Sequence, residues 1–182
     1  MSPEPRTQFN VAQLLKELIG GTRTYDVLVP VSHEDAELAH AEPLAGHLTM
    51  LRTNRGILVE GTLNGSIVVE CSRCLKGVAT PVTLNLEEEF VPTIDVVKGT
   101  FLQVEVDDTA ILIDEHHILD IAEVVRQALL LEIPMHLLCK PDCLGLCPTC
   151  GQDLNAGPCG CLPADADPRW VDLSALLSDV EM

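Results

Sequence analysis

The chain has 182 residues, a length that fits one domain or one domain with a small appendage. Hydrophobic residues make up 47% and aromatic residues only 3%, so the predicted core is aliphatic and a surface that stacks nucleobases on several rings is disfavoured. The net charge of −17 repels nucleic acid at long range and attracts basic partners. Every apolar stretch falls far short of the ~20 residues that a bilayer requires, so we expect no membrane association.

The N-terminal residues indicate a cytoplasmic protein. Residues 1–6 contain no basic region that leads into an apolar run, so we expect no signal peptide. Thiols stay reduced in the cytoplasm, where clustered cysteines are metal ligands more often than disulfides. The eight cysteines of this chain therefore indicate metal binding.

The first half of the chain predicts a short helix followed by an antiparallel β-meander. Asn10 can cap the helix, because apolar residues follow it at helical spacing as far as Ile19. Strands are predicted at residues 22–31, 44–53, 57–63 and 67–70. Asn64-Gly65 separates the last two, and Asn-Gly between extended runs is a strong signal for a hairpin turn. The last strand runs directly into Cys71.

The second half predicts two further strands and a longer helix before a Cys-rich segment. The strands are expected at residues 82–91 and 109–113, and the helix runs from Asp120 to Pro134, with Asp120 and Glu123 as a capping-box-like pair.

Together the elements predict an α+β fold in three parts. These parts are a mixed core in residues 1–138, a zinc-ribbon-like Cys-rich segment packed on it in residues 139–164, and a short C-terminal helix within residues 165–182, at 172–180.

The cysteines occur in closely spaced pairs: Cys71-x-x-Cys74, Cys139-x-x-x-Cys143, Cys147-x-x-Cys150 and Cys159-x-Cys161. One tight turn can supply two thiolates about a tetrahedral edge apart, and two such turns complete the four-coordinate shell that zinc prefers. The pattern therefore predicts one or two bound Zn²⁺ ions.

The spacing favours one pairing of the ligands and leaves others open. An eight-residue spacer, typical of a zinc ribbon, favours a site formed by the last four cysteines: Cys147, Cys150, Cys159 and Cys161. The first four would then form a second site that joins the meander to the segment after the long helix: Cys71, Cys74, Cys139 and Cys143. A single site from the two Cys-x-x-Cys pairs, or substitution of His136 as a ligand, remains an alternative.

Candidate contacts to a partner lie around the first cysteine pair. Residues 52–80 form the only net-positive stretch, through four basic side chains: Arg52, Arg55, Arg73 and Lys76. These side chains could contact RNA phosphates or another partner. They could equally be no more than solvent-exposed charges on the surface of a sheet.

Two enzymatic alternatives have weaker support. Cys71 and Cys74 could act as a thiol-disulfide oxidoreductase, but such pairs usually begin a helix, whereas here the pair follows a strand. Glu115, His116 and His117 could form an acid–base or metal cluster, but neighbouring side chains point apart in regular structure. We therefore expect no enzymatic activity, no catalytic residue and no small-molecule substrate.

Five motifs, in order, give the chain a resemblance to a known family. They are the segment 9–15 with 20–23, Cys71-Ser72-Arg73-Cys74-Leu75, the helix from Asp120 to Leu131-Glu132-Ile133-Pro134, the run 143–155, and Asp167-Pro168-Arg169-Trp170. With these motifs the chain resembles the bacterial YceD family, which is linked to accumulation of large-subunit ribosomal RNA. The resemblance implies a role in synthesis, processing or stability of 23S ribosomal RNA. It leaves open whether the partner is large-subunit ribosomal RNA, a ribosomal protein or both, and the net charge of −17 favours a basic ribosomal protein or a mixed surface.

Overall fold

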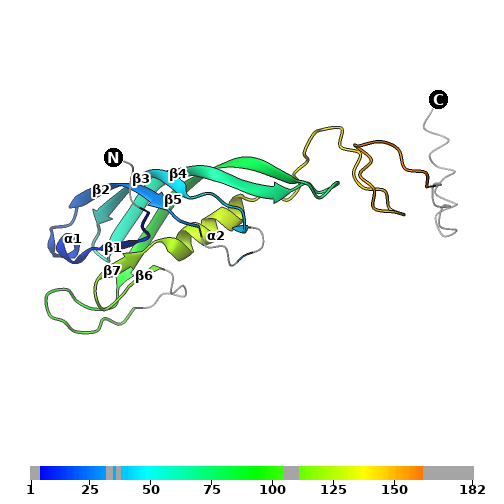
Figure 1. Cartoon of the computed structure of the whole chain (residues 1–182). Coiled ribbons are helices and arrows are strands. Elements are labelled where there is room, and N and C mark those ends of the chain that lie inside the picture. Colours follow the sequence, from blue (N-terminus) through cyan, green and yellow to red (C-terminus); the bar gives the residue numbers. More distant parts are fainter. Residues whose placement is uncertain (1–4, 32–34, 36–37, 105–110, 162–182) are drawn as a thin grey trace, which may run out of the picture.

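The computed structural model describes residues 5–31, 35, 38–104 and 111–161. Its helices and strands follow one another along the chain as β1 (Gln8–Asn10), α1 (Ala12–Lys16), β2 (Thr22–Val29), β3 (Leu44–Arg52), β4 (Ile57–Glu70), β5 (Gly77–Pro92), β6 (Leu112–Ile113), β7 (Ile118–Asp120) and α2 (Ala122–Glu132). The predicted α+β class is confirmed. Figure 1 shows an elongated molecule, with the sheet and both helices at one end and the Cys-rich segment at the other.

The described strands form a five-stranded sheet in the order β2-β3-β4-β5-β6 and a separate pair, β1-β7. From β2 to β5 each strand pairs antiparallel with the next, so the predicted meander is confirmed. β6 adds to β5 in parallel, which requires a crossover connection. Side chains along an antiparallel strand alternate between the two faces, and on β3 the buried side chains of Leu44, Leu48 and Met50 lie on one face.

The predicted turn at Asn64-Gly65 is wrong, because β4 continues through it as a single strand of 14 residues. Asn64 pairs with Ala45 on one side and with Thr83 on the other, and the Thr83 hydroxyl donates to the Asn64 side chain at 2.9 Å. Gly65 serves packing rather than turning. A Cβ there would lie 2.3 Å from Cδ2 of Leu44. The tertiary contacts of a central strand thus outweigh the local preference for a turn.

Helix α1 is shorter than the sequence predicted, and helix α2 is less amphipathic. α1 ends at Lys16, so Leu18 and Ile19 lie beyond it with 88% and 70% of their surface exposed. α2 has 11 residues and buries Val124, Val125 and Leu129, whereas Leu131 is 88% exposed.

The start of α2 differs from the predicted capping box. The Asp120 carboxylate accepts a hydrogen bond from the N–H of Ala122, whereas Glu123 pairs with Arg126. No described helix is long and apolar enough to cross a bilayer. The short helix predicted at residues 172–180 lies outside the described residues.

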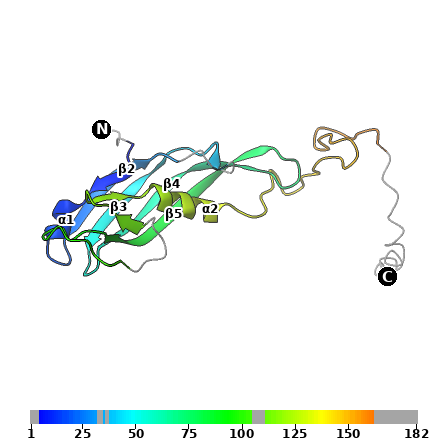
Figure 2. The same cartoon turned by 90° about the horizontal axis from the view of Figure 1, so that it is seen from below.

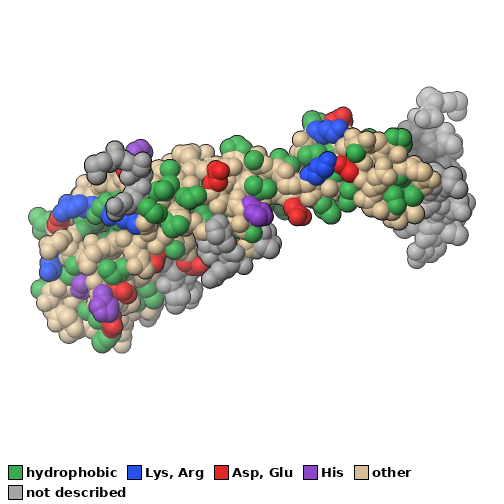
Figure 3. Space-filling view, in the orientation of Figure 1, with side chains coloured by type: hydrophobic (Ala, Val, Ile, Leu, Met, Phe, Trp, Pro, Cys, Tyr) green, Lys and Arg blue, Asp and Glu red, His purple; other side chains and the backbone are tan. Residues whose placement is uncertain are grey.

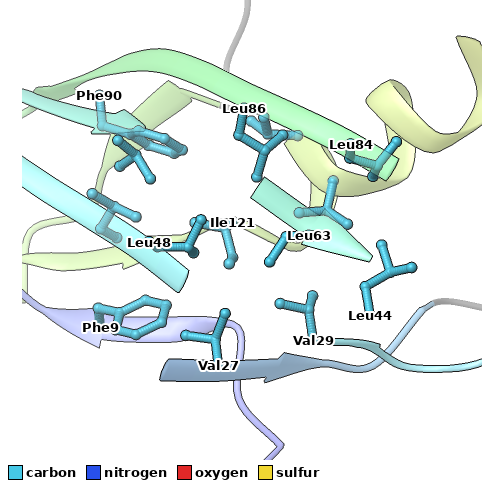
Figure 4. Close-up of a cluster of buried hydrophobic side chains, with 14 of the residues drawn as sticks. Phe9, Val27, Val29, Leu44, Leu48, Leu63, Leu84, Leu86, Phe90 and Ile121 are labelled. Atoms are coloured by element: carbon cyan, nitrogen blue, oxygen red, sulfur yellow. The ribbon is translucent and has the colours of Figure 1, made fainter. Parts of the chain in front are cut away.

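The core lies between one face of the sheet and the elements that cover it. Figure 2 shows α2 lying across the strands, and Figure 4 shows Phe9 of β1 and Ile121, which precedes α2, facing side chains of β2 to β5. The cluster is aliphatic apart from Phe9 and Phe90, as the composition predicted. The far ends of β4 and β5 leave this core and continue as a two-stranded hairpin toward the cysteines.

We expect Leu63→Ala to lower the free energy of unfolding by about 2–5 kcal/mol, because it leaves a cavity at a fully buried position of β4. Leu131→Ala is the matched control: the same substitution at an exposed helical leucine should change the free energy by less than about 0.5 kcal/mol. Urea unfolding of both variants measures the difference. Equal losses would mean that the buried face of β4 is wrongly assigned.

Candidate metal centres

The first pair of cysteines lies in the turn that closes the β4–β5 hairpin. The last paired residues of the hairpin are Glu70 and Gly77, and the side chains of Cys71 and Cys74 are buried between them and the Cys-rich segment. The strand pairing therefore positions two thiols at the far end of the sheet.

Two turns of the chain have the same backbone hydrogen bonds. In the first, the N–H of Cys71 donates to the carbonyl of Lys76 at 2.9 Å, and the N–H of Leu75 donates to the carbonyl of Cys71 at 3.0 Å. The turn that begins at Cys147 repeats these bonds at 2.8 Å and 2.9 Å. We call them the first knuckle, residues 71–76, and the second knuckle, residues 147–152.

The cysteine sulfurs form two groups of four, and within each group they all lie within 4.8 Å of one another. The first group comprises Cys71, Cys74, Cys139 and Cys143, and the second comprises Cys147, Cys150, Cys159 and Cys161. This grouping is the one that the sequence favoured. It differs from the alternative in which the two Cys-x-x-Cys pairs share one site, and His136 belongs to neither group.

The sulfur separations suit a tetrahedral metal ion. Sγ of Cys71 lies 3.9 Å from Sγ of Cys143, and Sγ of Cys74 lies 3.6 Å from Sγ of Cys139. Four zinc–sulfur bonds of ~2.3 Å in a tetrahedron place the sulfurs about 3.8 Å apart. A disulfide would require about 2.05 Å, and all eight cysteines are free. Each group can therefore hold one divalent ion.

The knuckles stabilise thiolates through backbone N–H groups. The backbone N–H groups of Cys74 and Arg73 donate to the sulfur of Cys71, and they lower the pKa of Cys71 to about 6. The corresponding N–H groups of the second knuckle lower the pKa of Cys147 to about 6. By contrast, a hydrogen bond to the sulfur of Cys150 raises the pKa of Cys161 to about 12. Further thiolates resist ionisation beside the first, and a divalent cation would remove that resistance.

Residues of the loop after the second knuckle support the first group of cysteines. The side-chain amide of Asn155 donates to Sγ of Cys143 at 3.4 Å and to the Asp153 carboxylate at 2.8 Å. Asp153 also pairs with Lys76 of the first knuckle at 2.5 Å, and this cation lowers the pKa of Asp153 to about 2. The N–H of Leu144 donates to Asn155 at 3.0 Å. The two groups are thus connected through one loop.

The Cys-rich segment is attached to the hairpin by the main chain and the side chain of Arg73 in the first knuckle. The carbonyl of Arg73 accepts from the N–H of Leu146 at 3.2 Å, and its guanidinium donates to the carbonyl of Cys143 at 2.8 Å. Gly145 has φ of 75°, and a Cβ there would meet the carbonyl of Arg73 at 3.0 Å. Only glycine fits this conformation and this close approach without strain.

The four basic side chains predicted to contact a partner lie at two ends of the sheet. β4, with 14 residues and a length of roughly 45 Å, separates Arg52 and Arg55 from Arg73 and Lys76. The Arg52 guanidinium donates to three backbone carbonyls, and Arg55 pairs with Glu89 at 3.5 Å. Figure 3 shows blue side chains at the Cys-rich end lying beside red ones.

The other polar cluster named from the sequence forms a turn. The Asp114 carboxylate accepts from the N–H groups of His116 and Ile118, so these contacts close the connection between β6 and β7. Sequence reasoning did not assign a role to Asn155 or Asp153. The only signal was their place in the motif of residues 143–155.

Comparison with known proteins identifies the family. The family model of the large ribosomal RNA subunit accumulation protein YceD matches residues 59–177, which is more than half of the chain. The chain belongs to the YceD family. The matched region of this YceD-family chain contains both groups of cysteines.

Relatives of this YceD-family chain occur in several bacteria and in a plant. An uncharacterized protein of Mycobacterium tuberculosis is 36% identical over 124 residues, which cover 68% of this chain and 57% of the relative. An uncharacterized protein of Bacillus subtilis is 31% identical over 119 residues, 64% of this chain and 63% of the relative. A chloroplast YCED homolog of Zea mays, named a large ribosomal RNA subunit accumulation protein, is 44% identical over 46 residues, 25% of this chain and 16% of the relative.

These alignments cover only part of each relative, so the chain spans little more than half of the length of the mycobacterial protein. No solved structure matches the chain.

We expect Asn155→Ala to weaken metal binding at the first group of cysteines by about 10- to 100-fold, because it removes the N–H donor to Cys143. Competition with a coloured chelator measures the affinity. Gln152→Ala is the control, since the Gln152 amide makes only a 3.4 Å bond to the carbonyl of Gly157. Equal affinities for the two variants would contradict a supporting role for Asn155.

Proposed function

We propose that this chain is a zinc-stabilised, non-enzymatic binding protein of the cytoplasm that supports accumulation of 23S ribosomal RNA during assembly of the large ribosomal subunit. The observation that carries the proposal is membership of a family described as large ribosomal RNA subunit accumulation proteins. The named maize relative bears the same description. The structure contributes the metal centres and the charge distribution that the proposal uses.

Zinc is the ion that best fits the donor set. Both groups consist of four thiols, and soft thiolate ligands in a tetrahedral arrangement favour zinc among the common cellular ions. We propose one Zn²⁺ in each group. Two short turns supply the ligands of the second group, residues 147–150 and 159–161, which is the arrangement expected for a zinc-ribbon-like segment. The role of the metal would be structural, because four protein ligands leave no open position.

A basic ribosomal protein is the favoured direct partner. The net charge of −17 opposes a long-range approach to ribosomal RNA and favours a basic polypeptide. Each zinc with four thiolates would add a net charge of about −2. The four basic side chains that could contact phosphates already have partners within the chain, as described above.

The oxidoreductase alternative gains no support. Cys71 and Cys74 lie in a group with two further thiols and follow a strand. A redox pair of this spacing usually lies at a helix N-terminus, where the helix lowers the pKa of the first thiol. In the described part of the chain the N–H groups of a tight turn perform that task, and they serve metal binding equally well.

We expect tagged chain purified from cells to retain a large-subunit ribosomal protein after ribonuclease digestion, because the proposed contact is to protein. The measurement is mass spectrometry of the bound fraction together with quantification of 23S ribosomal RNA before digestion. A chain that carries Cys71→Ser and Cys147→Ser lacks one ligand in each group of cysteines. It serves as the control that shows whether binding requires intact metal centres. Recovery of neither ribosomal RNA nor ribosomal proteins with the unaltered chain would contradict the proposed function.

A further inference from the structure

The two knuckles are the same turn built from different residues. Both have the pair of backbone hydrogen bonds described above, and in both the sulfur of the first cysteine accepts from the two N–H groups that lie two and three residues later. Position by position, Leu75 of the first knuckle therefore corresponds to Gly151 of the second. The two residues can therefore be compared at the same backbone conformation.

Both residues have a left-handed backbone conformation. Gly151 has φ of 73° and Leu75 has φ of 60°. Glycine adopts this region freely, whereas the Cβ of a leucine clashes with the neighbouring carbonyl, so leucine is strained there. No atom lies within 4 Å of a Cβ built on Gly151, so glycine is not required by crowding at this kind of position. The difference lies in what the leucine side chain contributes.

The leucine side chain contributes little to the folded chain itself. Leu75 is 59% exposed and belongs to neither cluster of buried apolar side chains in the described residues. His117 is the other described non-glycine residue at positive φ, and it differs. It is half-buried and connects two elements, since its N–H donates to Asp114 and its carbonyl accepts from Val11. The N–H of Leu75 also donates within its turn, to the carbonyl of Cys71, but glycine would make the same bond without strain. The exposed side chain of Leu75, unlike the half-buried His117, therefore gives the fold no benefit that glycine would lack.

We propose that Leu75 is a contact residue for the ribosomal partner, and that it inserts into an apolar pocket of a basic large-subunit ribosomal protein. The inference rests on the proposed function and names the part of the chain that makes the contact. Strained backbone conformations are concentrated at functional sites. Leu144, 65% exposed on the loop of the first group of cysteines, adds a second apolar side chain to the same end of the molecule.

Three observations favour a protein over RNA as the occupant. The two cations that flank Leu75 have partners within the chain, Arg73 at the carbonyl of Cys143 and Lys76 at Asp153, so part of their capacity to donate to phosphates is already used. Residues 71–77 and 139–161 contain no aromatic ring on which a base could stack. Leu75 lies within the net-positive stretch of residues 52–80, so charge acts here only at long range: the net charge of −17 on the whole chain attracts a basic polypeptide.

The test compares Leu75→Gly, which removes both side chain and strain, with Leu75→Asn, which places a polar residue that tolerates the left-handed region. Leu18→Gly is the matched control, because Leu18 is an exposed leucine beyond α1, at the opposite end of the sheet. Each full-length chain is titrated against purified large-subunit ribosomal proteins, tested singly, and against protein-free 23S ribosomal RNA. Zinc content and Tm are measured on the same samples.

We expect both Leu75 variants to bind a basic ribosomal protein at least tenfold more weakly than the unaltered chain, and the Leu18 variant to bind as well as it does. Leu75→Gly should keep its zinc and show a Tm no lower than that of the unaltered chain. Unchanged binding by the Leu75 variants would overturn the inference alone, as would a loss of zinc or of Tm in Leu75→Gly, or binding to 23S ribosomal RNA only. An unaltered chain that binds none of these molecules would overturn the proposed function as well.

Discussion

The gathering of eight thiols into two compact groups is the constraint on which the Cys-rich part of this protein depends. From Cys139 to Cys161 the structure contains no helix and no strand with more than an isolated bridge. The apolar side chains there are few: Leu146 packs against the sulfurs of the first group, together with Leu138 and Val78 from outside the segment. A segment with so small a core cannot offset the conformational entropy of ordering by burial alone. Metal–thiolate bonds supply the missing stabilisation in such segments.

The rest of the fold positions these thiols at a distance from the main core. The aliphatic core orders the sheet, and the long strands β4 and β5 extend beyond that core to hold the first knuckle. The first knuckle then holds the Cys-rich segment through Arg73 and through its two cysteines. Asn155, Asp153 and Lys76 link the second group back to the first. Changes in one group should therefore be transmitted to the other through a short chain of hydrogen bonds.

Sequence reasoning predicted those features that depend on local or repeating patterns. The successive predicted strands, the last of which runs into Cys71, predicted the meander and the place of the first cysteine pair. Sequence spacing favoured the same grouping of cysteines that the structure brings together, because ligands supplied by one turn must be neighbours in the chain. The family resemblance, drawn from five motifs, is confirmed by the family model.

The features that sequence reasoning predicted wrongly depend on contacts between distant residues. Asn64-Gly65 has the composition of a turn, but pairing with β3 and β5 keeps it extended. Leu18, Ile19 and Leu131 have helical spacing with their neighbours, yet no element of the described fold covers them. The support that Asn155 gives to Cys143 across 12 residues of sequence has no periodic signal at all. Likewise, the left-handed backbone of Leu75 follows from the shape of the turn rather than from its own preference.

The most direct test of the account is amide hydrogen exchange of the full-length chain, as purified and after removal of bound metal by a chelator. We expect the zinc-containing chain to protect the N–H groups that donate within the knuckles, those of Cys71, Leu75, Cys147 and Gly151. We also expect chelation to abolish this protection while the buried strand residues, such as Val59 and Leu63, stay protected. Equal protection of the knuckles before and after chelation would contradict the claim that metal holds the Cys-rich segment in shape.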